Sequence, residues 1–402
     1  MDELLKPATQ LLRAGRPHRG WVNTPVTRAS TYVFDNVQTW RETRAKREDE
    51  RLRSYGARGT DSTHALEDAL IVLEGGDRAQ LYSTGQAAIA TVMMAYLKPG
   101  DHVLITDAVY EPVRRFCLAH LARLGIDYEY YLPDGSDLAQ RIRPQTRMIY
   151  AECPGSLVYE MMDLPAVAAL AHSHDCLLAV DNTWGAGLLY RPLELGADIS
   201  IIAATKYLGG HADVMMGAVV CKAEVWPALQ RASIDFGQTV GADDAYLVLR
   251  GIRSLAPRLA MHQQHAMTVA TWLQAQPEVA AVLCPALPGD PNHALWQRDC
   301  HGTNGLLSIE FAPGISAAAT ERMVDALALF GLGASWGGFE SLVVPANLLN
   351  ARTLTDWSTR GAILRLHIGL EDPQDLIADL AQGMTYLHES SARLTGTTDL
   401  HR

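Results

Sequence analysis

Two short apolar runs that each lead to one ionisable residue constrain this chain most. The first is Leu177–Asp181 (LLAVD), and the second covers residues 200–204 and leads to Lys206. Such runs are typical of buried parallel strands that deliver side chains to the carboxyl edge of a sheet. Ligands of open α/β sheets bind at that edge. We therefore expect Asp181 and Lys206 to face one ligand.

An aspartate and a lysine at one sheet edge suit a cofactor that carries both a ring nitrogen and an aldehyde. Pyridoxal 5'-phosphate (PLP) has both groups: a lysine forms the Schiff base, and an acidic residue holds the pyridinium nitrogen. A strand-end aspartate is also a common N-cap or turn residue. Taken alone, the pattern leaves that structural alternative open.

The composition limits the classes of function that the chain can have. With 402 residues, 48% of them hydrophobic and 20% charged, it can bury a sizeable core in two domains. The formal net charge of −11 disfavours nucleic acid and anionic membranes as partners, and no run of about 18 apolar residues indicates a transmembrane helix. The first 15 residues lack the apolar core of a secretory signal, and six scattered cysteines without a CxxC pair indicate reduced thiols. We expect a cytoplasmic protein without a metal site.

A strand–turn–helix pattern near residue 85 indicates a phosphate site. Residues 79–82 read as a strand, Ser83-Thr84-Gly85-Gln86 as a turn, and residues 87–97 as a small, apolar helix. The helix start presents unpaired backbone N–H groups and the positive end of the helix dipole. Many α/β turns have this form, so the signal is weak without the downstream lysine.

The order of the expected elements predicts an α/β fold in two parts. Strands at His102–Thr106, residues 148–152 and Leu177–Asp181 alternate with helices, which indicates a large doubly wound sheet. After about residue 240, a long helical region (242–276) leads into a smaller α+β region. We predict an N-terminal arm at 1–54, a large cofactor-binding domain at 55–245 and a smaller C-terminal domain at 246–402. The mixed charges at 40–53 favour a solvated helix face over a binding patch, and such an arm can also pack on a second subunit.

Ten short motifs along the chain carry a family resemblance. They are YGARGT (55–60), LEGG (73–76), GDHVL (100–104), YEP (110–112), IYAECPGS (149–156), VDNTW (180–184), AATKYL (203–208), CPALPG (284–289), SWGG (335–338) and RLHIGLED (365–372). In this order they resemble the Cys/Met-metabolism family of PLP-dependent enzymes of fold type I, and its cystathionine β-lyases most closely. The resemblance runs from about Thr24 to about Leu387 and implies the PLP-dependent transferase-like fold.

The resemblance implies roles for three residues that act on the reacting carbon. Lys206 would form the Schiff base with PLP and then act as the proton shuttle. Asp181 would keep the pyridine nitrogen protonated, so that the ring accepts electrons. Tyr110 would stack on the cofactor ring and help to activate the incoming amine; the alternative for Tyr110 is a core aromatic.

Further residues match the family's cofactor and substrate sites. Gly85 and Gln86 would give backbone N–H groups to the phosphate, Thr205 would give a hydroxyl, and Ser156 would lie near the phenolic oxygen of PLP. Arg365 lies in an apolar strand, where an unpaired charge is costly. The resemblance gives it the substrate α-carboxylate as a bidentate partner, with Ser335 and Trp336 lining the same pocket.

One motif implies that the active site is shared between subunits. In related enzymes Tyr-x-Arg reaches the phosphate from a neighbouring subunit, and Tyr55 keeps the tyrosine. The chain should therefore form at least a homodimer, and the family is usually tetrameric. The expected arginine is Ala57, with Arg58 directly after it. Whether Arg58 compensates stays open; a lost charge-assisted contact costs roughly 1.5–3 kcal/mol.

Ala334 is the second departure from the family pattern. The residue before Ser335 is a tyrosine in close β-lyase relatives and a glutamate in many γ-acting ones, so alanine opens the substrate pocket and removes a marker of β against γ chemistry. The favoured function is carbon–sulfur cleavage of an L-amino acid thioether such as cystathionine by α,β-elimination. The alternatives are γ-elimination or γ-replacement on an activated homoserine or methionine-derived substrate, and a non-catalytic relative. Intact Lys206 and Asp181 count against the last.

Overall fold

The first part of the fold is a mixed seven-stranded sheet. In the computed structural model, which describes residues 5–16 and 20–388, its strand order is β1-β7-β6-β5-β4-β2-β3. Strand β7 is antiparallel to both of its neighbours, and the other neighbouring strands are parallel. The strands are β1 (Arg78–Tyr82), β2 (His102–Thr106), β3 (Asp127–Tyr131), β4 (Thr146–Glu152), β5 (Leu177–Asp181), β6 (Ile199–Ile202) and β7 (Gly217–Cys221).

Helices cover both faces of this sheet because its buried strands point apolar side chains both ways. In β2, Leu104 belongs to one core cluster, whereas Val103 and Ile105 belong to another. Helices α3, α7 and α9 supply the first cluster and α4, α5 and α8 the second. Their bounds are α3 (Asp61–Glu74), α4 (Gly85–Tyr96), α5 (Glu111–Phe116), α7 (Leu164–Ser173), α8 (Trp226–Asp235) and α9 (Ala242–Arg253), with the short α6 at Leu138–Arg141.

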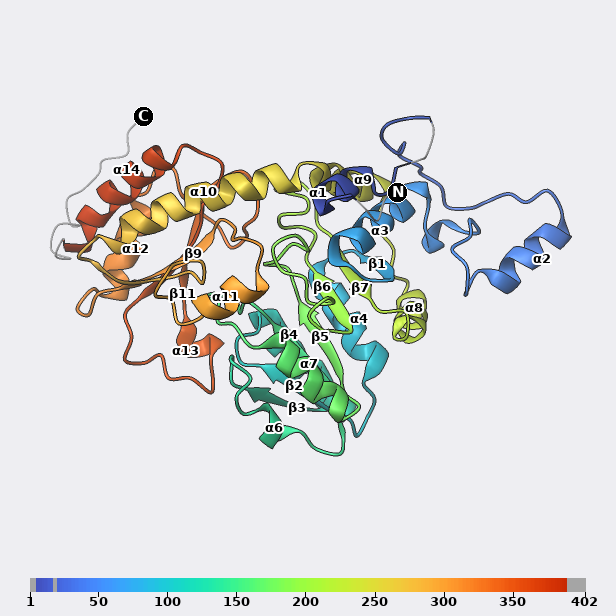
Figure 1. Ribbon diagram of the computed structural model, residues 1–402, viewed down its shortest axis with the longest axis horizontal. Helices are drawn as coiled ribbons and strands as arrows, with labels where there is room; N and C mark the ends of the chain where they lie inside the picture. Colours follow the sequence, from blue (N-terminus) through green and yellow to red (C-terminus); the bar gives the residue numbers. More distant parts are fainter. Residues whose placement is uncertain (1–4, 17–19, 389–402) are drawn as a thin grey trace, which may run out of the picture.

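A second, five-stranded sheet forms the other part of the fold. Its strand order is β10-β11-β12-β9-β8. Among the strand pairs described in this sheet, β10–β11 is parallel and the others are antiparallel. The long helix α10 runs from the large sheet to this one (Figure 1) and helps to close its core. The elements are α10 (Leu255–Gln274), β8 (Val279–Leu283), α11 (His293–Asp299), β9 (Leu306–Phe311), α12 (Ala317–Asp325), β10 (Gly331–Leu332), β11 (Leu342–Ala346), α13 (Leu348–Ala351), β12 (Ile363–His367) and α14 (Pro373–Met384). Below, the large-sheet region is 61–253 and the small-sheet region is 255–388.

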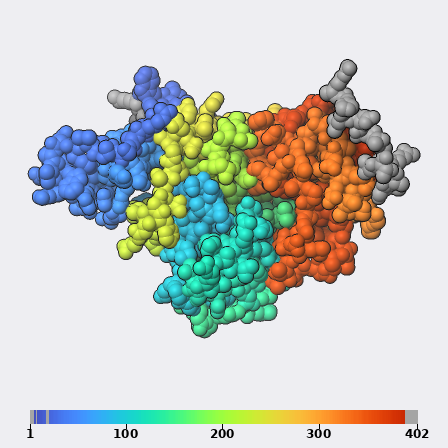
Figure 2. Space-filling view, turned by 180° about the vertical axis from the view of Figure 1, so that it is seen from behind, coloured from blue at the N-terminus to red at the C-terminus, as the bar shows by residue number. Residues whose placement is uncertain are grey.

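The N-terminal arm, residues 20–55, stands apart from both sheets. Its helix α2 (Val37–Lys46) has no buried residue and projects away from the body, whereas α1 (Pro7–Arg13) packs on α3 and α9 (Figures 1 and 2). The helix is solvated in the single chain, as the charge pattern predicted. It also exposes apolar side chains, with Trp40 at 41% and Val37 at 61% of their full surface.

Most expected elements are confirmed, and one expectation is wrong in detail. The helical region expected at 242–276 consists of two helices separated at Ser254. The strand in the second apolar run ends at Ile202 and does not reach residue 204. The Ala203 N–H donates to Thr183 Oγ1 and therefore does not pair with a neighbouring strand. Lys206 therefore lies in a turn after the strand. The boundary predicted at 245/246 falls inside α9 and stays a prediction. Among the described residues, no helix has the length and hydropathy to cross a bilayer.

Candidate active site

Lys206 lies in the turn after β6, half-buried, with its amine pointing toward the small-sheet region. Its Nζ donates to Ser335 Oγ at 2.8 Å and lies 5.2 Å from the ring centre of Trp336. Burial lowers the pKa of Lys206 to about 8, the Arg365 charge adds to this, and Asp181 opposes it. A fraction of the amine is therefore neutral near pH 7, as a nucleophile or base requires.

Asp181 ends β5 beside the start of this turn, and its carboxylate is held by one threonine. Oδ1 accepts from the Thr183 N–H at 3.0 Å and from Thr183 Oγ1 at 2.6 Å. Thr183 Oγ1 in turn accepts the Ala203 N–H at 2.9 Å, which ties the aspartate to the lysine turn. Burial raises the pKa of Asp181 although Thr183 and Lys206 lower it. A cationic ring nitrogen would compensate this buried carboxylate.

Tyr110 and Glu152 lie at the same sheet edge. Glu152 ends β4 in register with Asp181, and its Oε2 accepts the Tyr110 N–H at 2.6 Å. Burial, together with the nearby Asp181 charge, raises the pKa of Glu152 well above its ordinary value. Glu152 holds the Tyr110 backbone, while the tyrosine side chain stays 48% exposed. Sequence reasoning assigned Glu152 no role, although its apolar run ends in a carboxylate as that of Asp181 does.

The first turn of α4 meets the lysine turn where the phosphate was predicted. A Cβ on Gly85 would lie 2.8 Å from Ala203 Cβ, so only glycine allows this approach. Thr84 Oγ1 accepts the Ala87 N–H at 3.0 Å. The N–H groups of Gly85 and Gln86 have no intrahelical partners, because these residues are the first two of the helix. An anion fits this position. The predicted Thr205 hydroxyl is less available, because it already donates to the Met216 carbonyl at 3.1 Å.

Arg365 lies on β12, across the site from the large sheet, and is 7% exposed. Its Nη2 donates to the carbonyls of Gly333, Ala334 and Ser335 at 3.3, 3.1 and 3.1 Å. Within the described residues its buried Nε has no hydrogen-bond partner and no carboxylate pairs with the guanidinium. Burial lowers the pKa of Arg365. The incomplete pairing suits a carboxylate ligand, as predicted from the sequence.

The Ser335–Gly338 loop is packed against the lysine turn. Gly337 has a φ of 87°, and a Cβ there would lie 2.8 Å from Tyr207 N, so glycine is required on both counts. The Gly337 N–H donates to His367 Nε2 at 3.1 Å. Burial lowers the pKa of His367 to about 3, which keeps the ring neutral and able to accept. Sequence reasoning assigned His367 no role beyond its place in the RLHIGLED motif.

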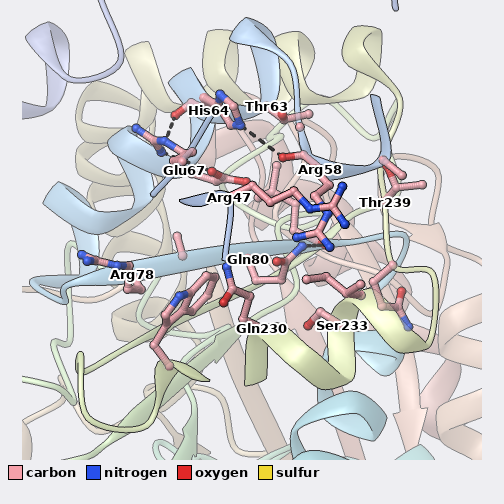
Figure 3. A pocket seen from close by; sticks show the side chains of 18 of the residues that line it. Arg47, Arg58, Thr63, His64, Glu67, Arg78, Gln80, Gln230, Ser233 and Thr239 are labelled. Atoms are coloured by element: carbon pink, nitrogen blue, oxygen red, sulfur yellow. Dashed lines mark hydrogen bonds and ion pairs between the residues drawn. The ribbon is translucent and has the colours of Figure 1, made fainter. Parts of the chain in front are cut away.

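Tyr55 and Arg58 do not join Lys206 within one chain. Tyr55 is 54% exposed on the arm, and Arg58 pairs with both oxygens of Glu48 at 3.0 and 2.9 Å. Arg58 and His64 line a cavity of about 370 Å³ between the arm, α3 and α8 (Figure 3), and neither Lys206 nor Asp181 lines it. The reach of Tyr55 and Arg58 into a neighbouring subunit stays a prediction.

The remaining two predicted residues border the site. Ser156 lies in the loop after β4, where its N–H donates to the Ala108 carbonyl at 2.8 Å, two residues before Tyr110. Ala334 is exposed beside Ser335, and its carbonyl contacts Arg365.

The residues present fit PLP. A lysine of lowered pKa, a buried carboxylate beside it and the open N–H groups of α4 match the aldehyde, the ring nitrogen and the phosphate. Gln86 Oε1 is also buried without a partner in the described part of the chain, at the same helix start.

Comparison with known proteins agrees with this chemistry. The family model described as Cys/Met metabolism PLP-dependent enzyme matches residues 8–385. Cystathionine beta-lyase of Bordetella avium is 48% identical over 90% of this chain and 92% of its own length. Cystathionine beta-lyase MetC of Escherichia coli is 41% identical, with 93% and 97% covered.

Solved structures share the whole architecture. The structure of metB from Corynebacterium glutamicum superposes with a TM-score of 0.86 at 29% identity, over 96% of this chain and 100% of that one. Cystathionine gamma-lyase from Lactobacillus plantarum gives 0.86 at 27% identity, over 95% and 99%. The geometry of the lysine turn and these similarities lead to one conclusion: the chain belongs to the Cys/Met-metabolism family of PLP-dependent enzymes.

Proposed function

We propose that the protein is a cytoplasmic carbon–sulfur lyase that cleaves an L-amino acid thioether such as cystathionine by α,β-elimination. The thioether and water give a thiol, pyruvate and ammonia. The observation that carries the proposal is the Lys206 amine of lowered pKa, held on Ser335 with Arg365 and Asp181 as its charged neighbours. Relatives named cystathionine beta-lyase at 39–48% identity support it, whereas a cystathionine gamma-synthase of Mycobacterium bovis is 34% identical.

The proposed mechanism assigns one task to each side chain. When bound, PLP supplies an electron-withdrawing ring that stabilises negative charge at Cα of the substrate. Arg365 binds the substrate α-carboxylate and orients Cα. Lys206 Nζ, in its neutral form, takes the proton from Cα and delivers a proton to the departing sulfur. Asp181 retains the proton on the ring nitrogen, and the N–H groups of Gly85 and Gln86 bind the phosphate.

The proposal includes a homo-oligomer in which Tyr55 and Arg58 of one subunit serve the phosphate of the next. The exposed apolar side chains of the arm support it, because an arm with no core of its own needs a surface to cover. Tyr110 lies beside the shared site and would stack on the cofactor ring.

Ala334 favours a second candidate, γ-elimination or γ-replacement on an activated homoserine or methionine-derived substrate. The small, exposed residue next to Ser335 leaves room on the distal side of the substrate. In either case the groups that act on Cα are the same.

Product analysis tests the proposal. The PLP-loaded protein is incubated with cystathionine and with bulkier cysteine and homoserine thioethers. Pyruvate indicates β-elimination, 2-oxobutyrate indicates γ-elimination, and a new thioether indicates replacement. Turnover of none of these substrates by a protein that binds PLP would overturn the proposed function.

A further inference from the structure

Two buried groups of opposite charge join the two regions of the molecule beside Tyr110. They are the Arg352 guanidinium, from the small-sheet region, and the Asp107 carboxylate, from the loop after β2. Both side chains are 0% exposed. Buried charges are tolerated only where their hydrogen bonds are satisfied, so the partners of each show what it holds.

Arg352 binds the loop that follows β4. Its Nε and Nη2 donate to the two oxygens of Glu160, both at 2.8 Å, in a bidentate pair. Nη2 also donates to the carbonyl of Ser156 at 2.6 Å. One guanidinium thus fixes both ends of the segment 156–160, and Ser156 is itself a residue predicted to contact the cofactor.

Asp107 binds the small-sheet region in the opposite direction. Its carboxylate accepts the Thr353 N–H at 3.0 Å, Thr353 Oγ1 at 2.7 Å and the Leu354 N–H at 2.9 Å, and Arg114 completes its shell. Although burial raises it, the hydrogen bonds from Arg114, Leu354 and Thr353 hold the pKa of Asp107 below its ordinary value. The carboxylate therefore stays charged at neutral pH.

The loop after β2 and the loop after β4 also contact each other directly. The Ser156 N–H donates to the Ala108 carbonyl at 2.8 Å, and a Cβ on Gly155 would lie 2.6 Å from Ala108 Cβ. Tyr110 follows Asp107 by three residues, and about half of its surface is exposed in the single chain. The placement of the Tyr110 ring therefore depends on the loop.

We propose that Asp107, Glu160, Arg352 and Thr353 form a clamp that positions Tyr110 and Ser156 over the lysine turn. Arg352 and Asp107 are positioning residues: they act through the two loops and touch neither substrate nor cofactor. The clamp deepens the proposed function, since it assigns the support of Tyr110 to the small-sheet region. The alternative is that these contacts only stabilise the association of the two regions and do not affect the position of Tyr110.

The test is a double-mutant cycle on the PLP-loaded protein with R352K, Y110A and the pair, because Y110A removes the ring that the clamp positions. Lysine keeps the charge but loses the bidentate geometry. We expect R352K to lower kcat/KM about tenfold and to weaken the visible circular dichroism band of bound PLP; in the Y110A background R352K should cost less than about twofold. R298K is the matched control, because Arg298 also pairs bidentately between the regions, with Asp163 at 3.0 and 2.9 Å, away from the Tyr110 loop.

Equal losses from R352K in both backgrounds, with an unchanged dichroism band, would overturn the clamp. Losses from R298K as large as those from R352K would overturn it too. If R352K does not fold, T353V replaces it in the cycle. T353V removes the hydroxyl contact to Asp107 and keeps the backbone contacts. The PLP dissociation constant and the dichroism band need no turnover, so they decide on the clamp even if no thioether proves to be a substrate.

Discussion

The two sides of the substrate position differ in how they are built. On the Cα side, Asp181 and Arg365 lie on β5 and β12, and Lys206 lies in the turn after β6, so the chain's own sheets position all three. Away from Cα, Tyr55 stands on the exposed arm, Arg58 follows the arm and pairs with Glu48, and Ala334 is a small residue at the surface. The groups proposed to act on Cα are thus positioned within one chain, whereas the proposed contact of Tyr55 and Arg58 with the phosphate needs a neighbouring subunit. Five predictions test this contrast.

The largest effect is expected on the Cα side from Lys206→Ala. Loss of the amine removes the proton shuttle, so turnover should fall by more than about a thousandfold while the fold persists. Steady-state kinetics and thermal unfolding measure the two properties. Lys222→Ala is the control, because the Lys222 Nζ contacts Asp198 and the Gly196 carbonyl, and neither is a predicted site residue. Residual turnover within tenfold of the wild type would contradict the role of Lys206.

Asp181→Asn should lower kcat about a hundredfold. The amide oxygen can still accept both hydrogen bonds from Thr183, so the geometry is retained while the negative charge is lost. The kcat of the PLP-loaded variant and its absorption spectrum check this. A loss below threefold would show that the carboxylate charge is not needed.

The lowered pKa of Lys206 predicts the pH dependence of its reaction with PLP. In the protein without cofactor, the ammonium form dominates below pH 8 and is unreactive, and the neutral amine dominates above it. The rate of cofactor binding should therefore rise about tenfold from pH 7 to pH 9 and then level off. A rate that keeps rising to pH 10.5 would mean an ordinary lysine. Stopped-flow absorbance provides the measurement.

Ala334→Tyr tests whether the small residue at position 334 determines the size of substrate that the site accepts. A large side chain beside Ser335 should lower kcat/KM for bulky thioethers about fivefold more than for cystathionine. Competition experiments with both substrates give this ratio directly. An unchanged ratio would remove Ala334 as a determinant of substrate size.

The smallest effect is expected from Ala57→Arg, directly after the arm. Arg58 is already paired with Glu48, so a new arginine would add a contact to the phosphate, and PLP binding should tighten about threefold. Equilibrium dialysis of the full-length protein measures it, with Ala57→Gln as the uncharged control. Equal effects of both variants would argue against a charge contact across subunits.

The sequence predicted the position of Asp181 at the end of a buried strand, because a strand buried in a sheet has few possible pairing registers. The roles of the groups on the Cα side stay predictions. Leu177–Asp181 can only end at the sheet edge once its apolar residues are buried, and Asp181 follows. The partners that tune these groups were not predictable, since Thr183, Glu152 and His367 act through contacts that depend on strand register and loop geometry. The motif alone predicted that the Thr205 hydroxyl binds the phosphate. Its hydrogen bond to the Met216 carbonyl depends on the path of the loop between these residues, which no local sequence pattern predicts.

The close packing of Gly337 on the lysine turn has a consequence for protein engineering. A library that varies the residues around the substrate would naturally include the whole Ser335–Gly338 loop. At Gly337 any side chain collides with the Lys206–Tyr207 backbone, so most members changed there would displace the reactive amine itself. Ala334, three positions earlier, is exposed in the single chain. Selection for new substrates is therefore best confined to Ala334, with Gly337 kept fixed.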